Sequence, residues 1–261
     1  MKNLHYILRT AAAMCFIGHG AFGIITKPIW CNYFAVFGIG KDLAYTLMPI
    51  VGSIDIIMGL ILLFYPIRAI PAWLVIWGIL TASLRPLSGE PFAELIERAG
   101  NFGAPLALLL LGSKPGQHLF RSGWSRLDPN PQPDEKTFAR VVLCLRVVVF
   151  LLLLGHGWLN LLEKKGLLSQ YAGLGFSSPR QVAHFVGGFE ILAALIALVK
   201  PIRSLLLVFF IWKMATELFY PKWELFEWVE RGGSYGAVLA LYIALGKPAI
   251  QKRSNQYKLA V

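Results

Sequence analysis

The sequence predicts an all-α integral membrane protein with eight transmembrane helices, arranged as two parallel four-helix repeats. Apolar residues make up 56% of the 261 residues and charged residues only 15%, whereas a soluble domain carries about a quarter charged residues. The apolar residues gather in long runs, and the second half of the chain resembles the first. Helices are expected because open strands cannot cross lipid with unpaired backbone groups.

An internal duplication defines the architecture. The stretch "GSIDIIMGLILLFYPIR" (52–68) matches "GGFEILAALIALVKPIR" (187–203), and "ERAGNFGAPLAL" (97–108) matches "ERGGSYGAVLAL" (230–241). A histidine between two glycines also occurs twice, at His19 and His156. Fixed-distance self-similarity of this kind is the signature of repeated structural units.

Each half contains four apolar segments of the roughly 20 residues that span a bilayer. An even number of spans per half makes the two repeats parallel. We expect a first repeat over 1–113, a polar cytoplasmic linker over 114–137, a second repeat over 138–250 and a basic tail over 251–261. The predicted spans are 7–25, 46–65, 69–87 and 92–112, then 140–161, 182–199, 202–220 and 225–245.

The formal charge of +11 lies mostly in the connections between apolar segments. Basic loops favour the cytoplasmic side and anionic lipid headgroups, so we expect the lipid bilayer, and no nucleic acid, as the partner. The side richer in Lys and Arg carries both termini, which predicts a multi-pass inner-membrane protein with cytoplasmic ends. The N-terminus imitates a signal peptide, but its pattern recurs at Arg146, so we expect it to be retained.

Ionisable side chains inside the predicted spans are costly and need a reason. The topology places most of them in the outer half of the membrane, which predicts a polar pocket or proton-handling site there. The alternative is that these residues only hold helices together. No catalytic residue is assigned. The candidates are His19, Asp55, Arg85, Glu97, Arg98, His156, Glu190, Lys213, Glu217, Glu230 and Arg231.

The flanking glycines allow a neighbouring helix or a flat ligand to approach the imidazole closely. Tight helix packing is one interpretation. Another is metal ligation, since His19 and His156 would face one another across a pseudo-two-fold axis and could hold a b-type haem. A third interpretation is proton handling with Asp55 and Glu190.

The halves also differ. Lys213 and Glu217 stand where the first half has Gly78 and Ala82. Their i, i+4 spacing predicts a self-neutralising pair on one helix face. Alternatively, Glu217 could pair with Arg85 across the pseudo-two-fold axis. In either arrangement the second half has extra polar groups, so a single site would be asymmetric.

The pattern resembles the DoxX-like membrane protein superfamily, here as a tandem duplication of its four-helix unit. The resemblance rests on an early arginine, a "G-x-x-E/D" acid and a "P-x-R" arginine. These are Arg9, Asp55 and Arg68 in the first half and Arg146, Glu190 and Arg203 in the second. The resemblance implies a four-helix bundle per repeat, association with membrane redox chemistry and a soluble or membrane redox partner subunit.

The predicted function is therefore a redox-associated or quinone-proximal accessory subunit. The sequence does not assign its cofactor, and quinone and haem b are the candidates. A small-molecule or lipid transporter is the second hypothesis, because parallel repeats with acids at mid-membrane also suit transport. A b-type haem protein that uses His19 and His156 is the third.

Overall fold

The computed structural model describes residues 1–113, 123–218 and 225–246, and all regular structure in these ranges is helical. An isolated bridge between Ile67 and Arg126 is the only β-type pairing among the described residues. The helices in chain order are α1 (Lys2–Ile24), α2 (Trp30–Ala35), α3 (Lys41–Phe64), α4 (Ala69–Leu87), α5 (Ala93–Glu97), α6 (Ala99–Leu111), α7 (Glu135–Leu161), α8 (Lys165–Gly173), α9 (Pro179–Val199), α10 (Arg203–Leu218), α11 (Leu225–Glu230) and α12 (Gly232–Leu245).

Among the described residues, five helices are long and apolar enough to cross a membrane: α1, α3, α4, α7 and α9. This confirms the all-helical, multi-pass character that the composition predicts. The predicted span 202–220 corresponds to α10 as far as Leu218, and its last two residues lie outside the described residues.

The predicted continuous helices over 92–112 and 225–245 are wrong in detail. A turn at Arg98 (φ −89°, ψ 15°) separates α5 from α6, and a turn at Arg231 (φ −72°, ψ −1°) separates α11 from α12. Alone, α6 has 13 residues, or about 20 Å of helix. Non-helical backbone at membrane depth is tolerated where it is buried in protein or lines a cavity, and both arginines are buried.

The boundaries of the predicted linker also change. Asp134 caps α7 by accepting a hydrogen bond from the Thr137 backbone N–H at 2.7 Å. Hydrogen bonding to the side chain and the backbone of Thr137 lowers the pKa of the exposed Asp134 carboxyl. The helix therefore begins inside the stretch 114–137. Residues 114–122 and the predicted basic tail 251–261 lie outside the described residues.

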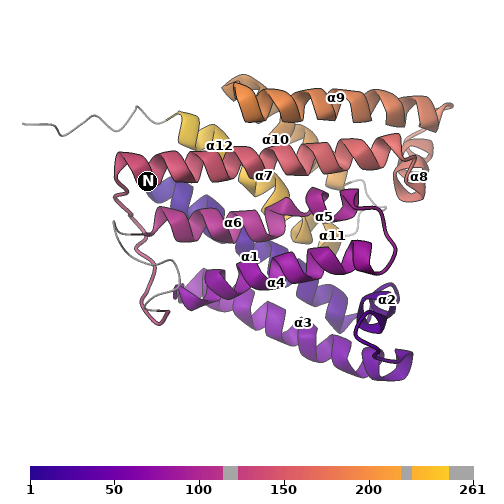
Figure 1. Cartoon of the computed structure of the whole chain (residues 1–261), viewed down its shortest axis with the longest axis horizontal. Coiled ribbons are helices and arrows are strands. Elements are labelled where there is room, and N and C mark those ends of the chain that lie inside the picture. The colour runs from indigo at the N-terminus through magenta and orange to yellow at the C-terminus, as the bar shows by residue number, and fades with distance from the viewer. Residues whose placement is uncertain (114–122, 219–224, 247–261) are drawn as a thin grey trace, which may run out of the picture.

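The helices run roughly parallel to one long axis, with α3 and α9 on opposite flanks (Figure 1). The N-terminus, the approach to α7 and the C-terminal end of α12 share one end, and α2, α5, α8 and α11 lie toward the other (Figure 1). The first helix of each half packs on the third and on the last pair of the opposite half: α1 on α3, α11 and α12, and α7 on α9, α5 and α6.

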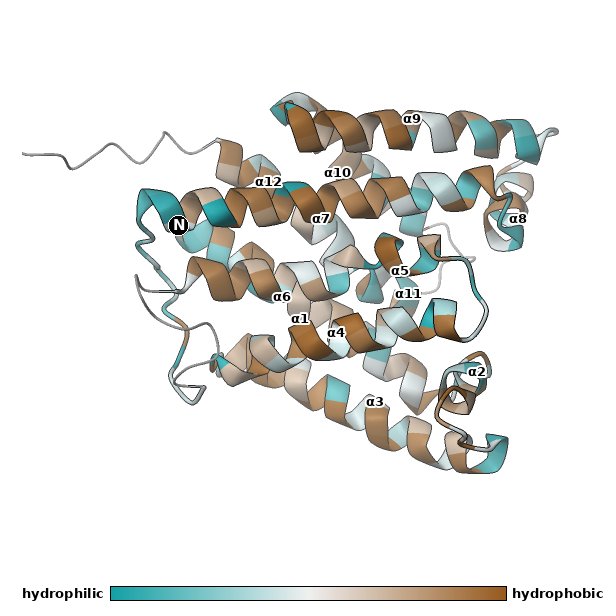
Figure 2. Ribbon diagram, viewed as in Figure 1, coloured by the Kyte–Doolittle hydropathy of each residue, from teal (hydrophilic) through white to brown (hydrophobic). Residues whose placement is uncertain are grey.

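The outer faces of the flanking helices are apolar. Exposed residues recur every three or four positions, as expected of a helix face in lipid, and the hydrophobic colour follows the helices along their length (Figure 2). They are Ile50, Ile54, Ile57 and Leu60 on α3, and Phe185, Phe189, Leu192 and Leu195 on α9.

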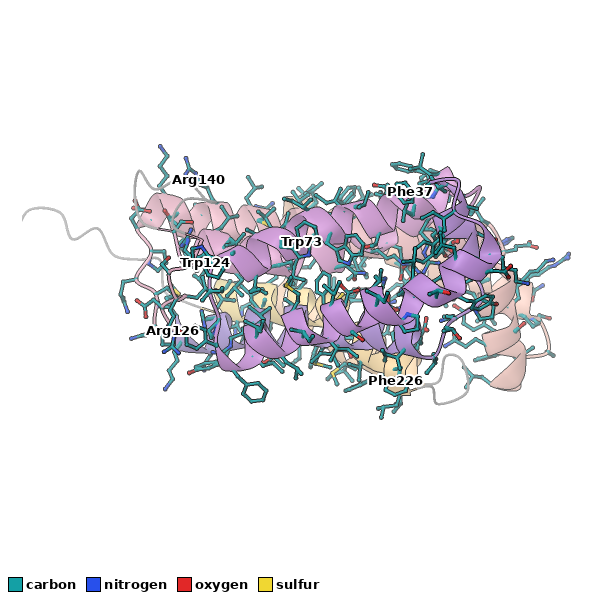
Figure 3. The ribbon with its side chains drawn as sticks, turned by 90° about the horizontal axis from the view of Figure 1, so that it is seen from below. Phe37, Trp73, Trp124, Arg126, Arg140 and Phe226 are labelled. Atoms are coloured by element: carbon teal, nitrogen blue, oxygen red, sulfur yellow. The ribbon has the colours of Figure 1, made fainter. Side chains whose placement is uncertain are left out.

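Basic and aromatic side chains mark the N-terminal end of the bundle. Trp124, Arg126 and Arg140 project there, while Trp73 lies midway along the bundle (Figure 3). Trp124 is 86% exposed. An indole beside arginines suits a membrane–water interface.

Two short helices were not predicted from the sequence. Helix α2 buries Trp30 and Tyr33 against α3, and α8 buries Leu167 and Tyr171 against α9. Because both lie in polar or interrupted connections, hydropathy gives no signal for them. They cover the end of the bundle at which the polar side chains gather.

Helices approach most closely at glycines. A Cβ at Gly20 would overlap the Gly52 carbonyl oxygen, and a Cβ at Gly157 would overlap that of Gly187. These contacts bring α1 against α3 and α7 against α9. Small residues at membrane helix crossings have this role, because packing and not water exclusion drives association in lipid.

Neighbouring glycines on α9 provide a matched test. Gly187→Ala should lower the melting temperature in detergent, because its Cβ would meet the Gly157 carbonyl oxygen and overpacking costs roughly 1–3 kcal/mol. Gly188→Ala should leave it unchanged or raise it, since nothing lies within 4 Å of that Cβ. Equal melting temperatures for the two variants would contradict the crossing.

Candidate ligand pocket and buried charge network

Each duplicated histidine pairs with the acid predicted for it. His19 Nδ1 lies 2.7 Å from Asp55 Oδ2, and His156 Nδ1 lies 2.5 Å from Glu190 Oε2. Both carboxylates are buried, at 1% and 0% exposure. Each acid on the second long helix of its half therefore orients the imidazole on the first.

The two glycines of each "GHG" stretch pack against different helices, and the first packs against the opposite half of the chain. A Cβ at Gly18 would overlap the backbone of Glu230, and a Cβ at Gly155 would overlap the backbone of Glu97. The broken helix of the opposite half thus lies directly against each glycine. Tight packing accounts for both glycines and places each imidazole beside the opposite half's Glu-Arg segment.

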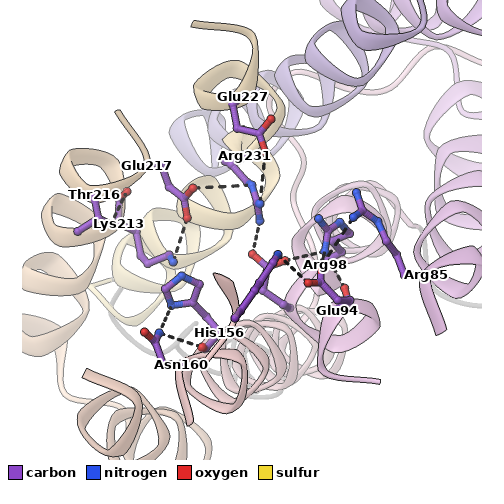
Figure 4. A network of polar contacts seen from close by, with 12 residues as sticks. Arg85, Glu94, Arg98, His156, Asn160, Lys213, Thr216, Glu217, Glu227 and Arg231 are labelled. Atoms are coloured by element: carbon purple, nitrogen blue, oxygen red, sulfur yellow. Dashed lines mark hydrogen bonds and ion pairs between the residues drawn. The ribbon is translucent and has the colours of Figure 1, made fainter. Parts of the chain in front are cut away.

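A network of buried charges joins the halves (Figure 4), and Glu97 connects them. Its carboxylate accepts hydrogen bonds from Arg98 Nη1 at 2.9 Å and from Arg231 Nη1. Arg231 also pairs with Glu217 at 3.7 Å and with Glu227 at 3.6 Å. One acid therefore connects the two arginines at the helix breaks.

The network continues through residues that the sequence analysis missed. Glu94 pairs with Arg98 at 2.6 Å and with Lys164 at 2.6 Å. In the other half, Glu227 pairs with Lys27 at 2.9 Å. Glu94 and Glu227 occupy matching positions in the duplicated stretches, as do Lys27 and Lys164, so the duplication itself was the signal that could have found them.

Arg85 belongs to the near edge of this network. It pairs with Glu90 at 3.1 Å and with Glu94 at 3.9 Å. Tyr33 donates its hydroxyl to Glu90 at 2.5 Å, and burial raises the pKa of Tyr33, which keeps the phenol a donor. The expectation that Arg85 reaches Glu217 is wrong, because nearer acids engage it.

Lys213 and Glu217 form the predicted i, i+4 pair. Lys213 Nζ lies 3.1 Å from Glu217 Oε1, at an angle that does not make a hydrogen bond. Lys213 is fully buried and Glu217 is 5% exposed. Glu217 is thereby held between Lys213 and Arg231.

Glu230 is the exception in the network. It is only 5% exposed, yet among residues 1–113, 123–218 and 225–246 its carboxylate has no hydrogen-bond or ion-pair partner. Its counterpart Glu97 engages both Arg98 and Arg231. Arg98 and Arg231 form their close ion pairs with Glu97 and act on Glu230 only at longer range.

The free carboxylate lines a pocket of about 150 Å³. One wall is aromatic, with Trp30, Tyr33, Phe34, Phe37 and Trp77, and the polar lining includes His19, Thr81, Arg85, Arg98, Asn101 and Glu230. The imidazole of His19 lies 4.6 Å from the Trp30 ring, centroid to centroid. The pocket is thus flat-walled and apolar with a few polar groups, as ligand sites usually are.

The second histidine lines a smaller pocket of about 30 Å³, together with Glu97, Trp212, Glu217 and Arg231. Here Tyr171 donates to Asn160 Oδ1 at 2.7 Å, and Asn160 donates to the His156 carbonyl oxygen at 3.0 Å. Burial raises the pKa of Tyr171, so it remains a donor.

The two histidines do not meet in one site. Their pockets share no lining residue, and each imidazole is turned to its own carboxylate. The described residues contain no group of three or more His, Cys, Asp and Glu suited to a metal ion. The geometry therefore does not favour a haem bound between His19 and His156.

The arginines that carry the family resemblance hold helix ends. Arg9 donates to the Leu62 carbonyl oxygen at 2.8 Å, and Arg146 to that of Val199 at 2.9 Å. Arg68 donates to the Gly112 carbonyl oxygen at 2.9 Å, and Arg203 to that of Tyr242 at 3.3 Å. The last carbonyls of a helix lack internal partners, so these arginines satisfy them.

No family model matches the chain, and no curated protein or solved structure matches it either. The resemblance to the DoxX-like superfamily stays a prediction.

Glu97 should be the acid on which the stability of the bundle depends most. Glu97→Gln would leave two buried guanidinium groups without their shared carboxylate, and breaking a buried pair costs roughly 3–5 kcal/mol. We expect a large drop in the melting temperature or failure to accumulate in the membrane. Glu163→Gln is the control, because its partners Arg180 and His184 are exposed and such pairs are worth about 0–1 kcal/mol. Similar stability of the two variants would contradict the network.

Proposed function

We propose that the chain is an inner-membrane protein of eight spans, built as a tandem pair of DoxX-like four-helix units with both termini in the cytoplasm. The five long helices would cross alone, and α10 and the broken pairs α5–α6 and α11–α12 would supply the other three spans. The matching contacts His19–Asp55 and His156–Glu190 support the duplication. The basic end seen in Figure 3 supports the orientation.

We further propose that the larger pocket binds the ring of a quinone, in a redox-associated accessory subunit. The observation that carries this is the aromatic wall of Trp30, Tyr33 and Trp77 beside the His19–Asp55 pair. A flat ring stacks favourably on aromatic faces. An imidazole backed by a carboxylate can donate to, or accept from, a ring oxygen.

Glu230 favours the reduced form of the ligand. Its carboxylate lines the pocket and has no hydrogen-bond donor among the described residues, so a ligand hydroxyl could donate a charge-assisted hydrogen bond to it. The hydroquinone has two such hydroxyls, whereas the quinone has none. His19 and Glu230 would then both accept hydrogen bonds from the bound ring.

The pocket wall reaches the surface that would face lipid. Leu80 on α4 is 38% exposed and Phe37 is 58% exposed, and both line the pocket. A hydrophobic ring with an isoprenoid tail could enter from the bilayer by this side. The resemblance to the DoxX-like superfamily implies a redox partner, so we include a soluble or membrane redox partner subunit in the proposed function.

The orientation can be measured with single cysteines. In a background with Cys15, Cys31 and Cys144 replaced by alanine, Ser169→Cys on α8 should react with an impermeant maleimide in intact spheroplasts. Asn130→Cys, in the approach to α7, should react only after permeabilisation. Labelling of Asn130→Cys from outside would contradict the proposed topology.

Ligand binding can be tested with decylubiquinol and tryptophan fluorescence, since Trp30 and Trp77 line the pocket. His19→Gln and Glu230→Gln should each weaken quenching by roughly tenfold in Kd, the effect of losing about 1.4 kcal/mol of hydrogen bonding. His156→Gln, the matching change in the other half, should leave Kd unchanged.

Two results would contradict the proposal: absence of saturable quenching in the wild-type protein, or equal weakening by His19→Gln and His156→Gln. Preference for decylubiquinone over decylubiquinol would contradict the assigned role of Glu230.

A further inference from the structure

The smaller pocket is lined largely by the counterparts of the residues that line the larger one. The sequence match between the halves pairs six lining residues of one with six of the other. His156, Val186, Trp212, Thr216, Arg231 and Glu97 stand for His19, Val51, Trp77, Thr81, Arg98 and Glu230. The histidine, the acid, the arginine, the threonine and one tryptophan of the first site therefore recur in the second, whereas the rest of the aromatic wall, Trp30, Tyr33, Phe34 and Phe37, has no counterpart among these pairs.

The volumes differ fivefold, at about 150 Å³ and about 30 Å³. The linings differ at α2 and α8. The matched helices also differ, because α10 has Lys213 and Glu217 where α4 has Gly78 and Ala82. Glu217 lines the smaller pocket, whereas Ala82 does not line the larger one. The added carboxylate thus stands at the wall of the site.

The acids beside the second pocket are held in place by neighbouring cations. Glu217 is held by Lys213 at 3.1 Å and by Arg231 at 3.7 Å, so it is fixed in place. The carboxylate that would receive a ligand, Glu97, is already bound to Arg98 and Arg231. The corresponding acid of the first half, Glu230, is free.

Stability alone does not require such a pair. Replacing both members of a buried ion pair by apolar residues is often neutral or stabilising, whereas removing one member is costly. Lys213 and Glu217 belong to one helix, and Glu217 also joins α10 to Arg231 at the break between α11 and α12. Glu217 also lines the smaller pocket together with His156.

We propose that the second half holds a latent site for the same class of ring ligand, kept closed by the Lys213–Glu217 ion pair. The protein therefore binds one ring per chain, in the first half. This inference rests on the proposed function of the larger pocket. It adds that Lys213 and Glu217 set the number of binding sites.

Binding stoichiometry tests the inference. Isothermal titration of the detergent-solubilised full chain with decylubiquinol should give one site per chain for the wild-type protein. Lys213→Ala combined with Glu217→Ala should give two, with added quenching from Trp212. A matched surface change, Glu163→Ala with Arg180→Ala, should leave the stoichiometry at one.

A second pair of variants separates volume from charge and avoids dependence on the double alanine protein. Lys213→Met with Glu217→Gln removes the charges but keeps the side-chain bulk, so one site is expected. Lys213→Met with Glu217→Ala empties the position that lines the pocket, so two sites are expected, even where the double alanine variant does not fold.

The outcomes are distinguishable. One site in the wild-type protein and still one in Lys213→Met with Glu217→Ala would overturn the latent site and leave the proposed function standing. Two sites in the wild-type protein would also overturn it. No binding to any of these proteins would overturn the proposed function and the latent site together.

Discussion

The buried carboxylate of Glu97, shared by Arg98 and Arg231, is the interaction on which the rest of the structure depends. It joins the two helix breaks, which lie at the Arg98 and Arg231 turns, and so ties the last helices of both halves together. Two buried guanidinium groups need a carboxylate close by, because an unpaired charge is costly in a low-dielectric interior. Both arginines pair with Glu97 and neither forms a close pair with Glu230, so the centre of the bundle is asymmetric although the two halves match in sequence.

That asymmetry accounts for the two unlike pockets. On one side Glu230 has no close ion pair and lines the pocket with the aromatic wall. On the other side Glu97 pairs with two arginines and Glu217 lines the smaller pocket. The same fold, the same histidine–acid pair and the same glycine contacts surround both. The difference between a binding site and a closed one thus lies in few side chains, principally Lys213 and Glu217.

The sequence predicts the long helices and the histidine–acid pairs well, because hydropathy and the repeated letters depend on local pattern. It does not predict α2, α8 or the breaks at Arg98 and Arg231, since these depend on tertiary contacts such as Gly18 against Glu230. The sequence also does not show which acid pairs with Arg85, because Glu90, Glu94 and Glu217 all compete for it and lie at different distances along the chain. Glu230 looked like its counterpart Glu97, and only three-dimensional pairing separates them.

The most direct test of the account is an experimental structure of the full chain with decylubiquinol bound. We expect density for one ring, beside Trp30 and Trp77, with a ring oxygen within hydrogen-bond distance of the Glu230 carboxylate and with Glu97 between Arg98 and Arg231. A structure in which Glu230 pairs with Arg98 and the ring lies elsewhere, or beside His156, would contradict it.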